Sequence, residues 1–423
     1  MRYGASPQAL QPRSAGQRRP EVAKKHSAVD EDNLGRKHRP DYTVVVIIGA
    51  LLAIGAVVVY AIGPGLTLGT DLAQNYYSSK QLTAIALGIG AFLAAAFTPI
   101  TKWRQIQPFI IGAAAIVALS VRFVGEEING AHRWIQFAGF SFQAAELVKF
   151  AIVLWLAAFL AQRRIDKQLG SIDTLKNLGL LVAGVIVVVA GMQSDLGSAV
   201  VMMAVIAGVA FIAGMPIKRL IIVGFVVLSL AIAAIVATPY RRDRVATFFN
   251  PTADCQAEGY QACQALITVG SGGIAGKGVG RSVQAYGYLP EPANDSVFAI
   301  TAEKFGFIGT TIILGLFATL FSRIARVAQR APTDYTQFLV VGVLVWLSVQ
   351  MLINVGAMVG LLPLKGITLP FISYGGTSII FVMAAMGIVF QVSRYTDLNS
   401  KSAVKSRQTN SYSSNRATYR RPA

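Results

Sequence analysis

Residues 43–63 read TVVVIIGALLAIGAVVVYAIG, 21 consecutive positions without a charged side chain. At about 1.5 Å per residue, a helix of this length is about 30 Å long, which matches the hydrocarbon core of a bilayer. Because backbone polar groups in lipid must pair within their own segment, this stretch predicts a transmembrane helix.

The rest of the chain repeats this pattern. Hydrophobic residues make up 54% of the sequence and charged residues 14%, against about 25% charged residues in a soluble domain. We therefore expect an all-α polytopic membrane protein of ten transmembrane helices, with a large extracytoplasmic loop between the seventh and the eighth. The expected spans are 43–63, 81–98, 108–124, 145–162, 177–192, 197–215, 219–238, 297–321, 337–360 and 371–392.

Basic residues are concentrated at the two ends of the chain. Residues 1–41 hold nine Lys and Arg and residues 393–423 hold seven, of 38 in all. Tails of this kind are typical of the cytoplasmic side, and two tails on one side require an even number of spans. We expect disordered basic cytoplasmic tails at 1–41 and 394–423 around one domain at 42–393, and no nucleic-acid partner despite the net charge of +18.

The loop at 239–296 departs from the charge rule, because it carries cations on the side where they are usually sparse. A long loop can cross the membrane regardless of its charge, and that interpretation stays open. Cations held at the outer surface would also suit a lipid-linked phosphate or pyrophosphate. The basic residues concerned are Arg241, Arg242, Arg244, Lys277 and Arg281.

The same loop is rich in glycine between residues 270 and 280. Glycine lets backbone N–H groups approach an anion, although a flexible loop explains the composition equally well. The stretch is not a Walker A motif, because Gly278 follows Lys277. Cys255 and Cys263 lie in this loop too, and on an oxidising face they either form a disulfide or stay as two free thiols.

Three acids follow the glycines. Glu291 and Asp295 are four residues apart, and Asp295 precedes the apolar run that begins at Val297. Asp295 could be only the N-cap of the eighth span, or an ionised group fixed near the lipid headgroups. Glu303 lies about two turns inside that span, where an acid is costly unless it is paired or lines a polar cavity.

Other polar residues lie within or beside the spans. Glu146 and Lys149 share one helix face, either as a packing ion pair or as part of a cavity lining. Arg133 could bind a phosphate. No spacing of His, Cys and carboxylates indicates a metal site made by the protein alone, which leaves room for a divalent cation held with the substrate. The further residues that we expect to line a cavity are Gln193, Asp195, Lys365, Ser373 and Tyr374.

These motifs resemble the SEDS family of bacterial cell-wall polymerases, the FtsW, RodA and SpoVE proteins. The likeness extends from about residue 43 to residue 393, and the wording KGITLP at 365–370 is more similar to FtsW than to RodA. Alanine and asparagine at 293–294, lysine and phenylalanine at 304–305, and Ala145 depart from the family's usual residues. The motifs are NGAHRWI (129–135), FQAAELVK (142–149), QSDLG (193–197), the segment from Tyr240 to Pro251, the glycine stretch, LPEPAND (289–295) and LPFISYGGTS (369–378).

The resemblance implies a peptidoglycan glycosyltransferase that polymerises lipid II by inverting transfer during cell division, with Asp295 as the essential residue. It implies no built-in cofactor, a location in the bacterial cytoplasmic membrane at the septum, and partners among class B penicillin-binding proteins and other divisome proteins. A flippase for the lipid-linked precursor and a non-catalytic scaffold are the alternatives. The residues expected at the substrate or its pyrophosphate are Arg133, Lys149, Arg241, Arg242, Arg244, Lys277, Arg281, Glu291 and Glu303.

Overall fold

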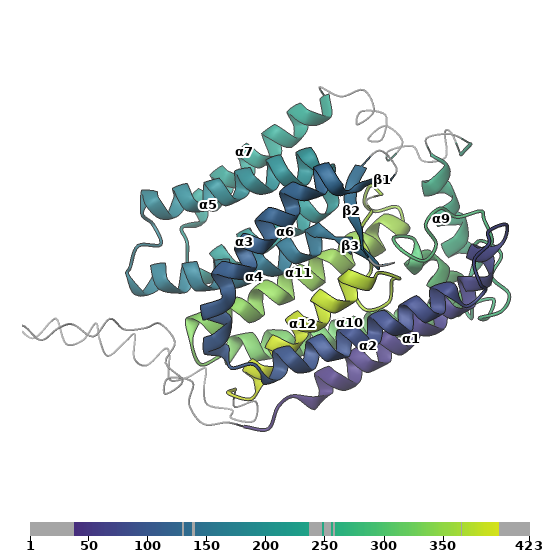
Figure 1. Cartoon of the computed structure of the whole chain (residues 1–423), viewed down its shortest axis with the longest axis horizontal. Helices are drawn as coiled ribbons and strands as arrows, with labels where there is room; N and C mark the ends of the chain where they lie inside the picture. Colours follow the sequence, from purple (N-terminus) through teal and green to yellow (C-terminus); the bar gives the residue numbers. More distant parts are fainter. Residues whose placement is uncertain are drawn as a thin grey trace, which may run out of the picture.

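The computed structural model describes residues 38–128, 131–137, 140–236, 248, 255–256, 259–364 and 366–396. Long helices run side by side through this part of the chain (Figure 1). The two tails, apart from residues 38–41 and 394–396, lie outside the described residues. In chain order the elements are α1 (Tyr42–Thr67), α2 (Tyr76–Phe97), α3 (Ile100–Val124), β1 (Glu126–Ile128), β2 (Ala131–Phe137), β3 (Phe140–Gln143), α4 (Ala144–Ile165), α5 (Ile172–Gly184) with a π-helical continuation (Val185–Met192), α6 (Leu196–Ala213), α7 (Ile217–Val236), α9 (Tyr260–Ser271), α10 (Val297–Gln329), α11 (Asp334–Met358) and α12 (Gly376–Ser393).

The expectation of a polytopic, predominantly helical membrane protein is confirmed. Nine helices within the described ranges are long and apolar enough to cross a bilayer, and each coincides with an expected span. The remaining expected span, 219–238, coincides with α7 (Ile217–Val236), which is not among the nine. The count of ten therefore stays a prediction.

The centre of the bundle is formed by α4 and α12. In the most apolar stretch of 18 residues of each of these two helices, 78% of the residues are buried by protein, against 17% in the corresponding stretch of α3. Close approach of α2 to α12 depends on glycine: a Cβ at Gly387 would collide with the backbone of Phe92. Small residues at such crossings let two helices in lipid gain van der Waals contact.

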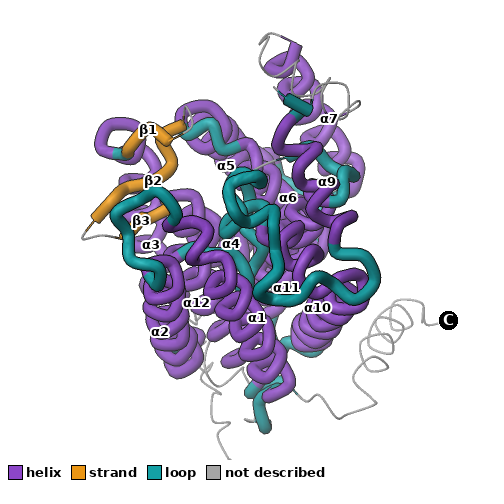
Figure 2. The backbone as a smooth tube through the Cα atoms, turned by 90° about the vertical axis from the view of Figure 1, so that its right-hand side faces the viewer, coloured by secondary structure: helices purple, strands orange, loops and turns teal. Residues whose placement is uncertain are grey.

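A three-stranded antiparallel sheet, absent from the sequence-based expectation, connects α3 to α4. Its order is β1-β2-β3, and Trp134 of β2 pairs with Gln143 of β3. The sheet, α9 and the connections before α10 and α12 lie at one end of the bundle, which we call the strand end (Figure 2). The seven residues of β2 are too few to stand out in a search for spans of helix length.

The last expected span was wrong at its start. It was placed at 371, whereas α12 begins at Gly376. Residues 371–375 are not helical because they form hydrogen bonds with the segment before α10: the Tyr374 N–H donates to the Ala293 carbonyl at 2.8 Å. Phe371 adopts a φ of 67°, a conformation that a helix does not contain.

The long helix α10 is broken at Gly306, which has φ 67° and ψ −167°. The N–H groups of Phe307 and Ile308, freed by the break, donate to the carbonyls of Gly273 and Ile274 at 2.9 and 3.1 Å. The loop between α9 and α10 therefore fills the break, so the backbone groups that it frees remain paired.

Candidate active site

Asp295 lies at the strand end, in the short segment that leads into α10. The Asn354 side chain of α11 donates to the carbonyls of Asp295 and Ile367, both at 2.7 Å. One buried amide thus joins α11 to two loops and fixes the backbone that carries the Asp295 carboxylate. The residue at the N-cap position is Ser296, so capping of the eighth span is not the role of Asp295.

The segment 369–375 holds the same loop from another side. The Ser373 hydroxyl donates to the Asn294 carbonyl at 2.7 Å and accepts from the Leu369 N–H at 2.7 Å. Together with the bond from Tyr374 to Ala293, this places two residues of the expected cavity, Ser373 and Tyr374, against the adjacent carbonyls of Ala293 and Asn294.

Among the described residues, Arg133 is a cation that lies near the Asp295 carboxylate. A Cβ built on Gly366 would lie 3.3 Å from Arg133 Nη1 and 3.3 Å from Asp295 Oδ2, so these two atoms flank the same glycine. The guanidinium also donates to the carbonyls of Gln193 and Ser194, at 3.3 and 2.7 Å. Arg133 therefore connects β2 to the turn before α6, and its positive charge lies close enough to act on Asp295.

Asp195 completes the turn before α6. Its carboxylate accepts from the Ser198 N–H at 2.9 Å as the N-cap of α6, and from the Gln143 side chain at 3.4 Å. Gln193 reaches in the other direction and donates to the Ala118 carbonyl at 2.9 Å. Both residues hold the turn in place, and Asp195 adds a negative charge near Asp295.

The surroundings of Asp295 raise the pKa of its carboxyl group to about 7. Burial is the largest cause, because it disfavours the charged form, and the charge of the exposed Glu291 is the next. The positive charge of Arg133 acts in the opposite direction. A carboxylate with a pKa near neutrality can both accept a proton during a reaction and release it afterwards.

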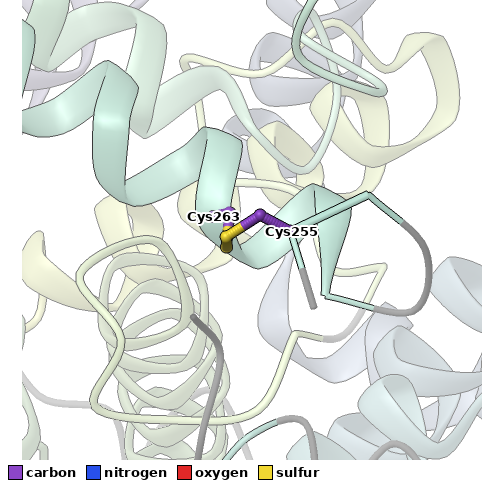
Figure 3. Close-up of a disulfide and its surroundings, with 2 residues drawn as sticks. All are labelled: Cys255 and Cys263. Atoms are coloured by element: carbon purple, nitrogen blue, oxygen red, sulfur yellow. A yellow bond between two sulfur atoms is a disulfide. The ribbon is translucent and has the colours of Figure 1, made fainter. Parts of the chain in front are cut away.

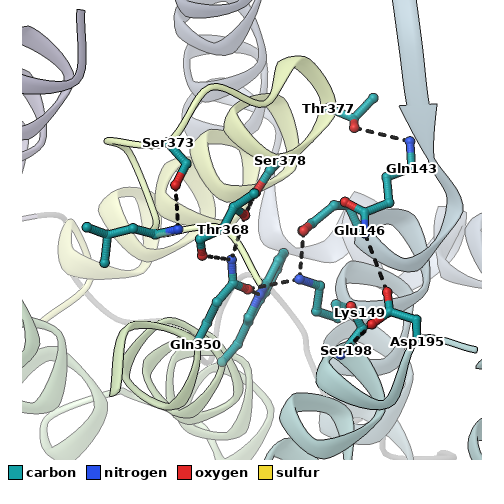
Figure 4. A network of polar contacts seen from close by, with 12 residues as sticks. Gln143, Glu146, Lys149, Asp195, Ser198, Gln350, Thr368, Ser373, Thr377 and Ser378 are labelled. Atoms are coloured by element: carbon teal, nitrogen blue, oxygen red, sulfur yellow. Dashed lines mark hydrogen bonds and ion pairs between the residues drawn. The ribbon is translucent and has the colours of Figure 1, made fainter. Parts of the chain in front are cut away.

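A second polar network lies in the interior beside this site (Figure 4). Lys149 Nζ lies 2.7 Å from Glu146 Oε1 and 2.8 Å from Gln350 Oε1, and all three side chains are buried. Gln350 then donates to the Thr368 carbonyl at 3.0 Å. Glu146 and Lys149 are thus an ion pair that α4 shares with α11 and with the segment before α12, and Lys149 is already paired with protein acceptors.

Glu303 and Lys277 form a separate cluster. The buried Glu303 carboxylate accepts from Lys277 Nζ at 3.1 Å, from the Ser282 hydroxyl at 2.5 Å and from the Val283 N–H at 3.1 Å. Next to it the buried Lys304 ammonium donates to the Val279 carbonyl at 2.8 Å. All of these partners belong to residues 277–283, so the two charged residues of α10 bind the loop and not solvent.

The glycines of this loop serve close packing. A Cβ at Gly272 would collide with the Ala302 carbonyl oxygen, and one at Gly276 with that of Lys304. The N–H groups of Lys277 and Gly278 donate to the carbonyls of Glu303 and Lys304, at 2.9 and 3.0 Å. The structure thus gives a reason for the glycine stretch other than the anion cradle suggested by composition.

Cys255 and Cys263 are joined by a disulfide at the start of α9, with Cα atoms 5.6 Å apart (Figure 3). Of the two states that the sequence left open, the structure has the bonded one. The bond ties the described residues 255–256 to α9, which packs against α10 and α11.

The expected site residues are therefore only partly brought together. Arg133, Asp195 and Glu291 surround Asp295, whereas Lys149 and Lys277 pair elsewhere and Arg281 is exposed. Within the described ranges no three His, Cys, Asp or Glu side chains converge as a metal site, and the expectation about metals stays a prediction. Arg241, Arg242, Arg244 and Lys365 lie outside the described residues.

Two residues of the site were missed in the sequence. Gln350 and Asn354 are amides four positions apart in a predominantly apolar span, and both are buried. Residues i and i+4 share a helix face. Polar side chains inside a span usually face the protein interior, so this pair was a signal for the inward face of α11.

The fold and the site define an integral membrane protein that holds a carboxylate of raised pKa and an arginine at the end of a helical bundle. The family model described as "Cell cycle protein", that of FtsW, RodA and SpoVE, matches residues 42–398. The chain belongs to this family of FtsW, RodA and SpoVE proteins.

The chain aligns with individual relatives over nearly the whole length of each relative. The chain is 34% identical to stage V sporulation protein E of Bacillus subtilis over 85% of this chain and 99% of that one. It is 33% identical to a probable peptidoglycan glycosyltransferase FtsW of Coxiella burnetii, over 84% and 97%.

Two solved structures share the fold. A chain from a peptidoglycan synthase complex, in which polymerization and crosslinking are structurally coordinated, aligns with a TM-score of 0.69 at 28% identity, over 84% of this chain and 98% of that one. The rod shape determining protein RodA of Thermus thermophilus aligns with a TM-score of 0.62 at 26% identity, over 85% and 98%.

Proposed function

We propose that this protein is a peptidoglycan glycosyltransferase that polymerises lipid II, with Asp295 as the general base. The observation that carries the proposal is the Asp295 carboxylate, with a pKa of about 7, fixed beside Arg133 in a segment anchored by Asn354 and Ser373. Relatives named peptidoglycan glycosyltransferase support the reaction class.

In the proposed reaction, the 4-hydroxyl oxygen of the acceptor GlcNAc attacks the anomeric carbon of the donor sugar. The bond from that carbon to the pyrophosphate oxygen breaks, undecaprenyl pyrophosphate leaves, and the configuration at carbon inverts. Asp295 accepts the proton of the attacking hydroxyl, a kind of assistance that contributes roughly 10²–10⁴-fold. Arg133 stabilises the charge that develops on the departing pyrophosphate.

This role requires the strand end to face the outside of the cell, because glycan strands are assembled there. The opposite end carries Asp41, whose carboxylate lies 3.5 Å from the Arg323 guanidinium, and Arg164, which pairs with Asp334 at 3.4 Å. The connections at that end also hold the basic residues Lys102, Arg104, Arg163, Lys167, Arg326 and Arg330. This excess of cations supports a cytoplasmic location for that end, where α1 begins and α12 ends, and we propose that both tails are cytoplasmic. We further propose action at the division septum, because KGITLP is similar to FtsW.

The likeness to a chain of a peptidoglycan synthase complex supports an enzyme partner. By that likeness we propose a class B penicillin-binding protein as the transpeptidase, with other divisome proteins around the pair. We assign no cofactor to the protein. A divalent cation, if the reaction uses one, would be held jointly with the substrate pyrophosphate.

The test is purified full-length protein with labelled lipid II, analysed for glycan strands on a gel. We expect strands from the wild type and none from Asp295→Ala, with Asp71→Ala as the matched control because Asp71 is an exposed acid between α1 and α2. Strands from Asp295→Ala at the wild-type rate would refute the assignment of the base. Transport of lipid II without any strands would favour a flippase.

A further inference from the structure

Two tyrosines lie beside the Asp295 loop and have no part in the proton transfer. Tyr77 is in the first turn of α2, and Tyr374 is in the segment before α12. Their ring centroids are 5.4 Å apart with an interplanar angle of 69°, an edge-to-face contact, and both side chains are partly exposed. The Tyr77 ring also contacts the Tyr76 ring, with centroids 5.4 Å apart and an interplanar angle of 87°. Because the Tyr77 and Tyr374 side chains are partly exposed, part of their surface stays available for a ligand.

The tyrosine pair is attached to the loop that carries Asp295. The Tyr374 N–H donates to the Ala293 carbonyl at 2.8 Å, two residues before Asp295. On the other side, the Tyr77 hydroxyl is close enough to Glu291 for the two groups to interact electrostatically. The Tyr374 backbone and the Tyr77 hydroxyl therefore both lie near the segment 291–295, which carries Glu291 and Asp295.

Glu291 is held in a defined conformation although it is exposed. Its φ is 47°, its carboxylate accepts from the Asn294 side chain at 2.6 Å, and its carbonyl accepts from the Asn294 N–H at 3.1 Å. An exposed residue with positive φ is uncommon and is kept in that state by its surroundings.

The chemistry of Tyr77, Tyr374 and Glu291 differs from that of Arg133. A carboxylate repels a pyrophosphate, but it accepts hydrogen bonds from hydroxyl groups. Aromatic rings offer apolar faces to the C–H groups of a sugar while their hydroxyls remain polar. Rings combined with a few fixed polar groups are typical of small-ligand sites. The combination suits an uncharged saccharide and not the leaving group.

A tyrosine near a bilayer surface can also be a simple interface anchor. Tyr60 of α1 fits that description, because its side chain is 69% exposed. Tyr77 and Tyr374 differ from it, since they pack on each other and adjoin the loop before α10. Tyr60 is therefore a suitable control residue.

We propose that Tyr77, Tyr374 and Glu291 form a saccharide subsite that binds the sugar rings of the acceptor and presents its hydroxyl to Asp295. This inference rests on the proposed function, because the acceptor is defined by that reaction. The subsite positions the acceptor before proton transfer, and holding two reactants in the right geometry is a large part of catalysis.

The first measurement needs no turnover. Binding of a soluble GlcNAc–MurNAc tetrasaccharide is titrated in the Asp295→Ala background, in which no strand can form. We expect Tyr77→Leu and Tyr374→Leu to weaken binding by about threefold to tenfold each, the range expected for one aromatic contact. Tyr77→Phe and Tyr374→Phe should retain binding, and Tyr60→Leu should not change it. Equal binding by the leucine and phenylalanine variants would overturn the proposal.

The second measurement separates KM from kcat in polymerisation of lipid II by chains with Asp295 intact. The leucine variants should raise KM and shorten strands with a smaller change in kcat, at an unchanged midpoint of thermal unfolding. If both leucine variants had the KM of the wild type, the subsite would be refuted, and the proposed polymerase would still stand. The opposite outcome is also possible: the wild type makes no strands, yet it binds the tetrasaccharide and the leucine variants bind it more weakly. That result would refute the proposed polymerase and leave the subsite standing.

Discussion

The ammonium group of Lys277 lies 3.1 Å from the carboxylate of Glu303, which is fully buried within the first turns of α10. With the Ser282 hydroxyl and the Val283 N–H, three donors of the preceding loop converge on one acid. Because that loop also fills the break of α10 at Gly306, the cluster fixes the part of the chain that leads to Asp295.

We expect Glu303→Ala to lower the stability of the protein by roughly 1–3 kcal/mol, because it leaves buried donors unpaired. Lys277→Met should cost less, because the Glu303 carboxylate keeps its hydrogen bonds from Ser282 and Val283 and the lost ion pair is partly exposed on the Lys277 side. Denaturant unfolding in detergent measures both. Equal losses for the two variants would contradict a buried acceptor at the centre of the cluster.

In a plot of polymerisation rate against pH, the fall in rate on the acid side (the acid limb) should have its midpoint near pH 7. A general base must be ionised, so activity falls as the pH drops through the pKa of Asp295, which is about 7. Glu291→Gln removes one of the charges that raise this pKa and should move the limb to lower pH. Arg133→Gln removes a charge that lowers it and should move the limb to higher pH. A limb that both variants leave in place would exclude titration of Asp295 as its cause.

A methyl group at residue 366 should impair catalysis while the fold survives. In Gly366→Ala the new Cβ would lie 3.3 Å from both Arg133 Nη1 and Asp295 Oδ2, and neither φ nor backbone contacts oppose it. We expect kcat to fall by about tenfold, because small displacements of a base from its acceptor proton are costly. An unchanged kcat would show that these two groups move aside without consequence.

The glycine stretch should tolerate substitution unequally. Gly276 has a φ of 81° and faces the Lys304 carbonyl oxygen, so Gly276→Ala combines backbone strain with a collision. Gly280, four residues on, has neither problem. Folded yield in membranes and the thermal midpoint should drop sharply for Gly276→Ala and stay near wild type for Gly280→Ala. Similar behaviour of the two variants would favour a merely flexible loop.

The disulfide between Cys255 and Cys263 closes a short loop at the start of α9. Bonds of this kind typically contribute roughly 2–4 kcal/mol, so Cys255→Ser with Cys263→Ser should lower the thermal midpoint. Maleimide labelling of the denatured protein should modify neither thiol before reduction and both after it. Labelling of both thiols without reductant would exclude the bond.

Several features followed from the sequence alone. A spanning segment must be apolar over its whole length and pair its own backbone groups, and both requirements are local. Residues 43–63 therefore predicted α1, and eight further expected spans coincide with helices that are long and apolar enough to cross a bilayer. The resemblance of its motif singled out Asp295, whose role stays a prediction, and helical spacing indicated the pairing of Glu146 with Lys149.

Only the tertiary structure decided how these parts meet. Asn354 binds the Asp295 carbonyl across 59 positions of sequence, and Tyr77 contacts Tyr374 between the second span and the last. The role of the glycines changed for the same reason, since their neighbours lie on α10. Hydropathy measures how a segment partitions between water and lipid, whereas a site is made by side chains that packing brings together from distant segments.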